Sequence, residues 1–196
     1  MAEKAYHHGN LRNALIEAGI KLINDKGIHQ FSLRRVAVIC EVSHTAPYAH
    51  FKDIDSLLKA MSEHVAMQFT ETLNAVIEGR EIGGRVITEL GKAYVTFFIE
   101  HPNYFQFLFD QSGIKIDLDS EQSNDYPPFA LFRDTAYQLF KNLNLPAQAQ
   151  KQLLIALWAQ VHGIAALATN GNIRYSGDWT ALMDTSMFLE GEQICV

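Results

Sequence analysis

Helical spacing of apolar residues is the feature that most constrains how this 196-residue chain can fold. Apolar side chains recur at intervals of three and four through almost every long segment, and no segment alternates apolar and polar residues as a strand does. Glycine, proline or polar stretches separate these segments. The pattern predicts an all-α protein of about nine helices, near residues 11–27, 32–40, 43–50, 53–79, 84–100, 102–112, 127–143, 147–170 and 177–190.

Capping residues support the first two helices. Gly27 suits the end of the first helix, since glycine adopts the left-handed conformation there without a steric cost. Ser32 is suited to cap the second helix, and Phe31 and Val36 are spaced for a hydrophobic contact across that cap.

The next two helices carry signals of the same kind. Ser43 is the expected cap of a very short third helix, which tolerates Pro47 only in its first turn. Asp53 is the expected cap of a fourth helix that runs to about Gly79 and connects an N-terminal region to the rest of the chain.

Charge is distributed unevenly along the chain. Residues 1–60 hold eight Lys and Arg against six Asp and Glu, whereas the remainder holds eight against sixteen, so the total is −6. The small positive excess at the N-terminus suggests that only this region faces a polyanion.

Several classes of protein are disfavoured by composition and motif. The two cysteines, Cys40 and Cys195, suggest neither a disulfide framework nor a metal cluster, and a redox switch through either is disfavoured. No signal peptide is evident, and the apolar stretch 153–168 is expected to be a buried helix rather than a membrane span. We therefore expect a cytoplasmic protein with no cofactor, no metal and no membrane partner. No catalytic triad order or glycine-rich phosphate loop supports an enzyme.

Residues 32–52 predict a helix-turn-helix, in which two short helices cross so that the second enters the DNA major groove. Apolar residues occur where the helices must touch, at Val36, Ala37, Cys40 and Val42. Polar and aromatic residues occur on the side expected to face outward, at Ser43, His44, Thr45 and Tyr48.

The same window resembles the N-terminal signature of the TetR family over roughly residues 8–60. The matching pattern is Ala37-x-x-Cys40-Glu41-Val42-Ser43-x-x-x-x-Tyr48-x-His50-Phe51, continued by Lys52-Asp53 and Leu57-Leu58. One departure is Glu41, where the family usually has glycine. A left-handed turn at Glu41 would be strained, and its carboxylate would mildly repel DNA.

The resemblance implies a DNA-binding domain at residues 1–55 and a ligand-binding and dimerisation domain at residues 56–196. The residues implied in DNA contact are Arg34, Ser43, His44, Thr45, Tyr48, His50 and Lys52. For His50, phosphate contact and packing in the core are both open, whereas Phe51 is expected in the core. A basic arm at residues 4–8 and the N-terminus of the fourth helix are expected to add phosphate contacts.

Aromatic residues are concentrated in the C-terminal region, where they form either a core or the wall of an apolar effector pocket. The candidate ligand-binding residues are Phe98, His101, Tyr104, Phe105, Phe129, Phe132, Trp158 and His162. Trp158-x-x-x-His162-Gly163 also resembles a Trp-His-Gly pattern in one branch of the family.

The segment 153–168 is apolar on nearly all sides, so one side is expected to face its own domain and the other a second subunit. The candidate dimer residues are Leu157, Val161, Trp179, Leu182, Met183 and Leu189. The expected function is that of a homodimeric repressor on double-stranded, pseudo-palindromic operator DNA, controlled by a small, largely apolar effector. The alternatives are an all-helical enzyme and an interaction protein without sequence-specific DNA binding.

Overall fold

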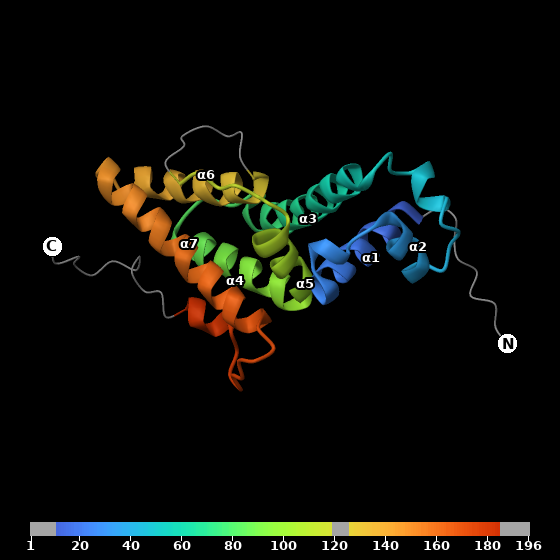
Figure 1. Ribbon diagram of the computed structural model, residues 1–196. Helices are drawn as coiled ribbons and strands as arrows, with labels where there is room; N and C mark the ends of the chain where they lie inside the picture. Colours follow the sequence, from blue (N-terminus) through green and yellow to red (C-terminus); the bar gives the residue numbers. More distant parts are fainter. Residues whose placement is uncertain (1–10, 119–125, 185–196) are drawn as a thin grey trace. The chain divides into compact units, whose positions relative to one another are not determined.

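A computed structural model describes residues 11–118 and 126–184, and over these residues the chain forms helices and no strands (Figure 1). The predicted all-α class is therefore confirmed. The helices are α1 (Leu11–Lys26), η2 (Ile28–Gln30), α2 (Leu33–Ile39), η3 (Ala46–Ala49), α3 (Ile54–Ile77), α4 (Gly84–Glu100), α5 (Pro102–Gln106), η4 (Phe107–Gln111), α6 (Pro127–Asn142), α7 (Ala147–Thr169) and η5 (Thr180–Met183).

The chain divides into two compact units. The N-terminal unit combines the described residues up to Val65 with the distant segment Gln106–Gly113. The C-terminal unit contains Ala66–Phe105 and the described residues from Ile114 onward. Helix α3 therefore contributes its first half to one unit and its second half to the other.

Caps at Ser32 and Asp53 are confirmed. The Ser32 hydroxyl accepts a hydrogen bond from the backbone N–H of Arg35 at 3.3 Å, at the start of α2. At the start of α3, the backbone N–H of Ser56 donates to the Asp53 carboxylate at 2.8 Å. Each side chain thus satisfies one of the amide groups that a helix start leaves without an intrahelical partner.

The cap predicted at Ser43 is wrong. Its carbonyl, rather than its hydroxyl, accepts from the N–H of Ala46 at 3.0 Å, and its hydroxyl lies 3.1 Å from that of Thr45. The predicted third helix is the 3₁₀-helix η3, with Pro47 in its first turn. Its i→i+3 bonding leaves no α-helical N-terminus for a side chain to cap.

The last predicted helix also differs. Residues 177–179 are not helical, and the described chain ends its regular structure with η5, whose start is held by Asp178 through the N–H of Thr180 at 2.8 Å. A short polar side chain of this kind binds its own backbone two residues on, which favours a turn over a continued helix.

The core of the N-terminal unit is built from α1 and α2. Leu15 and Ile16 of α1 and Val36 and Ala37 of α2 are fully buried. Phe107 of η4 is also fully buried in this unit, although it comes from far along the sequence.

The core of the C-terminal unit centres on Phe69 of α3. Its ring lies 4.7 Å from that of Phe97, 4.8 Å from that of Phe98 and 5.0 Å from that of Tyr94. Helices α4, α6 and α7 pack against one another around these rings (Figure 1). Aromatic pairs at such separations add to the stability that burial of their area provides.

Candidate DNA-binding surface and ligand-binding interior

The turn after α2 has the left-handed geometry of a Schellman motif, with Glu41 at the residue where glycine is usual. Glu41 has a φ of 56°. Its N–H donates to the Val38 carbonyl at 3.1 Å, and the Val42 N–H donates to the Ala37 carbonyl at 3.0 Å. These are the two bonds of that motif, so the turn forms despite the side chain at Glu41.

All seven candidate DNA-binding side chains are exposed. They are Arg34, Ser43, His44, Thr45, Tyr48, His50 and Lys52. Pro47 and Phe51 are buried, so η3 is held from beneath while Tyr48, which is 58% exposed, faces outward. The exposure of His50 leaves phosphate contact as the better of its two interpretations.

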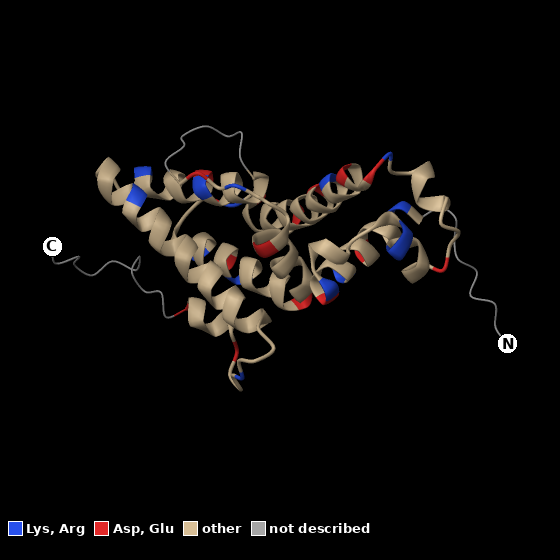
Figure 2. Cartoon of the chain, viewed as in Figure 1, with Lys and Arg blue, Asp and Glu red and all other residues tan. Residues whose placement is uncertain are grey.

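Basic residues on α1, on α2 and just before α3 accompany this surface (Figure 2). Two of them, Arg12 and Arg35, were not among the DNA-binding residues predicted from the sequence. Arg35 donates to the carbonyl and side-chain oxygens of Gln30, at 3.0 and 2.7 Å, and is thus fixed to the preceding turn. Arg12 lies over the Phe51 ring, 5.5 Å from its centroid. The signal that would have found Arg12 was its place at the start of α1.

The N-terminus of α3 holds a carboxylate of its own. The hydrogen bond from the Ser56 backbone, and then that from its side chain, lowers the pKa of Asp53. The ionised carboxylate occupies one amide donor of the helix start, so Lys52 is the nearest group at this position suited to attract a phosphate.

The candidate ligand-binding residues lie in the C-terminal unit, in two neighbouring groups. Phe105, Phe129, Trp158 and His162 form a chain of ring contacts with centroid separations between 5.0 and 5.5 Å. His101 stacks on Tyr104 at 4.9 Å in the second group. The buried ring of Phe98 contacts Phe105 at 5.2 Å and Phe97 at the same distance, which connects the groups.

The remaining candidate, Phe132, is almost fully buried on α6.

Two buried tyrosines of this interior were missed as polar candidates. The Tyr94 hydroxyl lies 3.2 Å from His162 Nδ1, within hydrogen-bond distance. The Tyr126 hydroxyl is buried and has no hydrogen-bond partner among residues 11–118 and 126–184. Burial raises the pKa of both phenols, so both are neutral. No sequence signal marks Tyr126, which precedes Pro127-Pro128 at the start of α6.

Three of the six candidate dimer residues lie inside the protomer. Leu157, Val161 and Met183 are buried, because this side of α7 packs on α4 and because η5 covers Gly91 with the Met183 side chain. Their assignment to the dimer interface stays a prediction, and within one protomer these three side chains belong to the core. Trp179 and Leu182 are half-buried, and Leu189 lies outside the described residues.

The other side of α7 is apolar and open. Ala156, Ala159 and Leu167 are exposed, and a side chain added at Gly163 would meet nothing within 4 Å. By length and composition α7 could cross a membrane, and only 22% of its most apolar window is buried within the chain.

Metal binding finds no support in the part of the chain that is described. There, His, Cys, Asp and Glu nowhere gather in a group of three or more that could hold an ion.

Two family models match the chain. The family described as bacterial regulatory proteins, tetR family, matches residues 15–61. The family described as tetracyclin repressor-like, C-terminal domain, matches residues 87–187, which is more than half of the chain. The first match contains the whole exposed surface around η3.

Solved structures with the same fold extend over both units. A protein of unknown function from Rhodococcus sp. RHA1 is 25% identical, covers 93% of this chain and 94% of its own, and has a TM-score of 0.64. A TetR-like transcriptional regulator from the same organism is 16% identical, with 90% and 93% covered and a TM-score of 0.66. A TetR-family transcriptional regulator from Haemophilus influenzae RD is 18% identical, with 90% and 94% covered and a TM-score of 0.68.

Proposed function

Because the chain belongs to the TetR family of transcriptional regulators, with an N-terminal DNA-binding domain, we propose that it is a repressor controlled by a small molecule. It is a regulator and not an enzyme. It binds a pseudo-palindromic operator in the cytoplasm as a homodimer, and an effector in the C-terminal unit changes its affinity for that operator.

The observation that carries the proposal is the exposed surface around η3. Tyr48 faces solvent above a buried Pro47, and Lys52 follows immediately at the start of α3. A phenol and an ammonium so exposed are suited to phosphate oxygens. His44 and Thr45 carry hydrogen-bonding groups that are suited to base edges.

A second subunit is required by the size of this surface. A short recognition helix contacts only a few base pairs, so specificity needs two half-sites spaced by roughly 34–36 Å or a multiple of that distance. The open side of α7 supports pairing, since its small residues Ala156, Ala159 and Gly163 allow two helices to approach closely.

An effector site in the aromatic interior is supported by its mixture of rings and buried hydroxyls. Half-buried Trp158 and His162 border the buried rings, and Tyr126 offers a hydroxyl that bonds to none of the described residues. An apolar cavity with a few polar groups is the usual form of such a site. A coupling of about 1–3 kcal/mol between effector and DNA would change operator affinity roughly 5–150-fold.

The DNA-binding proposal is tested with Tyr48→Ala and Lys52→Ala, using the intergenic region upstream of the protein's own gene as the probe DNA. Binding is measured by fluorescence anisotropy across a salt series. Both variants should weaken binding, and Lys52→Ala should reduce the slope of log affinity against log salt by about 1. Lys141→Ala, which alters an exposed lysine of α6 in the C-terminal unit, is the control. If Tyr48→Ala and Lys52→Ala both bind DNA as the wild-type protein does, η3 and Lys52 are not part of the DNA interface.

A further inference from the structure

A polar groove lies in the C-terminal unit, between the second half of α3 and helix α4. Its volume is about 520 Å³, within the range of sites that hold small molecules. It is lined by Gln68, Glu71, Thr72, Val76, Glu89, Lys92, Ala93, Thr96, Phe97, Glu100 and His101. The groove shares His101 with the effector candidates named from the sequence, whereas its other lining residues are not among them, so it lies beside the effector interior proposed above.

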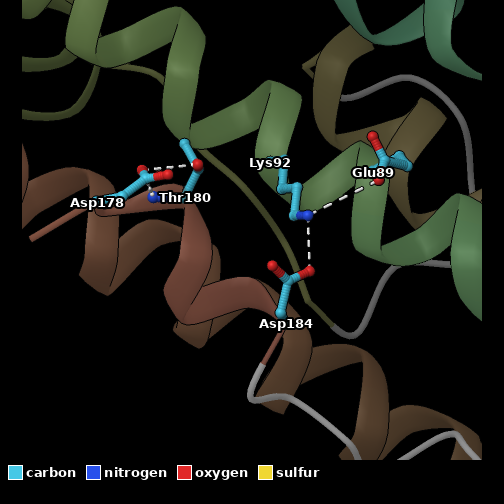
Figure 3. A network of polar contacts seen from close by, with 5 residues as sticks. All are labelled: Glu89, Lys92, Asp178, Thr180 and Asp184. Carbon is cyan, nitrogen blue, oxygen red and sulfur yellow. Dashed lines mark hydrogen bonds and ion pairs between the residues drawn. The ribbon is translucent and has the colours of Figure 1, made fainter.

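Carboxylates dominate the charge of this groove. Glu71, Glu89 and Glu100 line it, against the single ammonium group of Lys92. The Lys92 Nζ lies 2.6 Å from the Asp184 carboxylate and 3.8 Å from that of Glu89 (Figure 3). Its positive charge is thus met chiefly by Asp184, whose hydrogen bond raises the pKa of Lys92.

Glu71 and Glu100 are the two carboxylates at the rim of the groove. Among the described residues, neither Glu71 nor Glu100 forms an ion pair, and both are exposed at the rim of the groove. Glu71 comes from α3 and Glu100 from the end of α4, so the two helices present negative charge from opposite walls. A cation between them would gain attraction from both sides.

Apolar surface lies next to these charges. Phe97 and Ala93 of α4 and Val76 of α3 belong to the lining, and His101 stacks on Tyr104 at the same end as Glu100. Phe97 is almost fully buried and stacks on Phe69, so the half-buried His101 is the ring that can meet a ligand, while Val76 and Ala93 favour an apolar body attached to the charge.

A second hollow lies next to the groove, at the α3–α4 connection. Arg80, Glu81 and Arg85 line this second hollow, and Glu89 belongs to both. Its two guanidinium groups are balanced by two carboxylates, so it attracts a cation less than the groove does. The positive group of a ligand is therefore favoured at Glu71 and Glu100, with its apolar part toward Val76 and Ala93.

We propose that this groove binds an organic cation, an ammonium compound with a small aromatic or aliphatic body. A bare metal ion fits the groove less well, because no group of three metal ligands occurs in the described residues. The proposal concerns a second site, which shares His101 with the proposed effector interior, and it does not depend on where the operator binds.

The test is isothermal titration calorimetry on the full-length protein with 2-phenylethylammonium and its uncharged near-isostere 2-phenylethanol. The ammonium compound should bind and the alcohol should bind at least several-fold more weakly, with an affinity for the ammonium that falls as NaCl is added. Spermidine, which has charge without a ring, shows how much of the affinity comes from charge and how much from the ring of the ligand. Equal binding of amine and alcohol, or no binding of the amine at concentrations on the order of 10 mM, would overturn the proposal.

Charge-neutral variants locate the site. The double variant Glu71→Gln with Glu100→Gln should lower the affinity for the ammonium about fivefold to tenfold, as expected for two partly solvated charge pairs. Glu78→Gln, which removes an exposed carboxylate just beyond α3 and outside the groove, is the matched control and should leave affinity unchanged. Both are exposed isosteric changes, and circular dichroism confirms folding. Equal losses in the double variant and the control would reduce the effect to general electrostatics and refute the site.

Discussion

Glu41 stands where backbone geometry and side-chain chemistry disagree. The turn after α2 needs a left-handed residue, and the hydrogen bonds of that turn form with Glu41 at a φ of 56°. For a residue with a Cβ this conformation costs roughly 1–2 kcal/mol. The same side chain is exposed beside the proposed DNA surface, so it adds a carboxylate to a region that should attract phosphates.

Two substitutions separate these costs. Glu41→Gly should raise the free energy of unfolding by about 0.5–1 kcal/mol, because relief of strain exceeds the added freedom of the unfolded chain. Glu41→Gln should leave stability nearly unchanged. Both should strengthen DNA binding modestly and similarly, since both remove the charge. Urea unfolding and anisotropy titrations measure the two effects.

Asn144 supplies the internal control. It has the same geometry after α6, with a φ of 55°, and asparagine tolerates that region better than glutamate. Asn144→Gly should therefore stabilise the protein less than Glu41→Gly does. A gain at Asn144 equal to that at Glu41 would show that strain at the glutamate is not the cause.

Tyr126 offers the second test at a single residue. A buried hydroxyl without a partner costs about 1–3 kcal/mol relative to one that is satisfied. Tyr126→Phe should therefore maintain or raise the free energy of unfolding measured in urea without effector. Tyr94→Phe should lower it by about 1 kcal/mol, because the Tyr94 hydroxyl bonds His162. A clear loss of stability in Tyr126→Phe would mean that its hydroxyl already has a partner in solution.

At the scale of elements, helix boundaries set by proline and glycine could be predicted from sequence. Helix α4 begins at Gly84 and ends at Glu100, before Pro102, as its flanking residues indicated. Local rules decide such ends, because proline and glycine act through their own backbone conformations. The form of η3 depends on bonding over four residues, which periodicity cannot resolve.

Whether a helix forms was easier to predict from the sequence than which hydrophobic core it joins. The predicted helix at 102–112 forms, but it continues past α5 as the π-helical η4, with the Ser112 N–H bonded to the Phe107 carbonyl at 2.7 Å. The segment 106–113 belongs to the N-terminal unit, a tertiary fact that spacing within the helix does not encode. Likewise, apolar character made Leu157 and Val161 candidate dimer residues, but it did not show that they lie on the side of α7 that faces its own protomer.

The placement of η4 predicts an effect on the DNA-binding unit from a residue far along the chain. Phe107→Ala empties a fully buried position of that unit and should cost about 3–5 kcal/mol. Protection of α1 amides from hydrogen exchange should fall, and operator binding should weaken near the reduced melting temperature. The half-buried Phe109→Ala should show a smaller loss. If the α1 amides stay equally protected in Phe107→Ala, η4 is not part of the core of the N-terminal unit.

At the scale of the whole molecule, α7 raises the question of what covers its open side. A helix this apolar is stable in water only if its exposed side is covered. The open side carries Ala156, Ala159, Gly163 and Ala166 at spacings of three and four, which lets another helix approach closely. Pairing with a second copy covers this surface and also supplies the second DNA-binding head that a two-half-site operator requires.

Gly163→Arg tests that arrangement without disturbing the protomer. A side chain at Gly163 meets no atom within 4 Å in the single chain, so the fold should persist, whereas a charged side chain would be buried without a partner in the proposed interface. The variant should sediment as a monomer at concentrations where the wild-type protein is a dimer. Operator affinity should fall much further than affinity for one half-site, because each isolated head keeps its own contacts. Gly171→Arg, at another open glycine just beyond α7, should remain a dimer. If Gly163→Arg also remains a dimer, the open side of α7 is not the subunit interface, and its apolar surface must be covered by another partner.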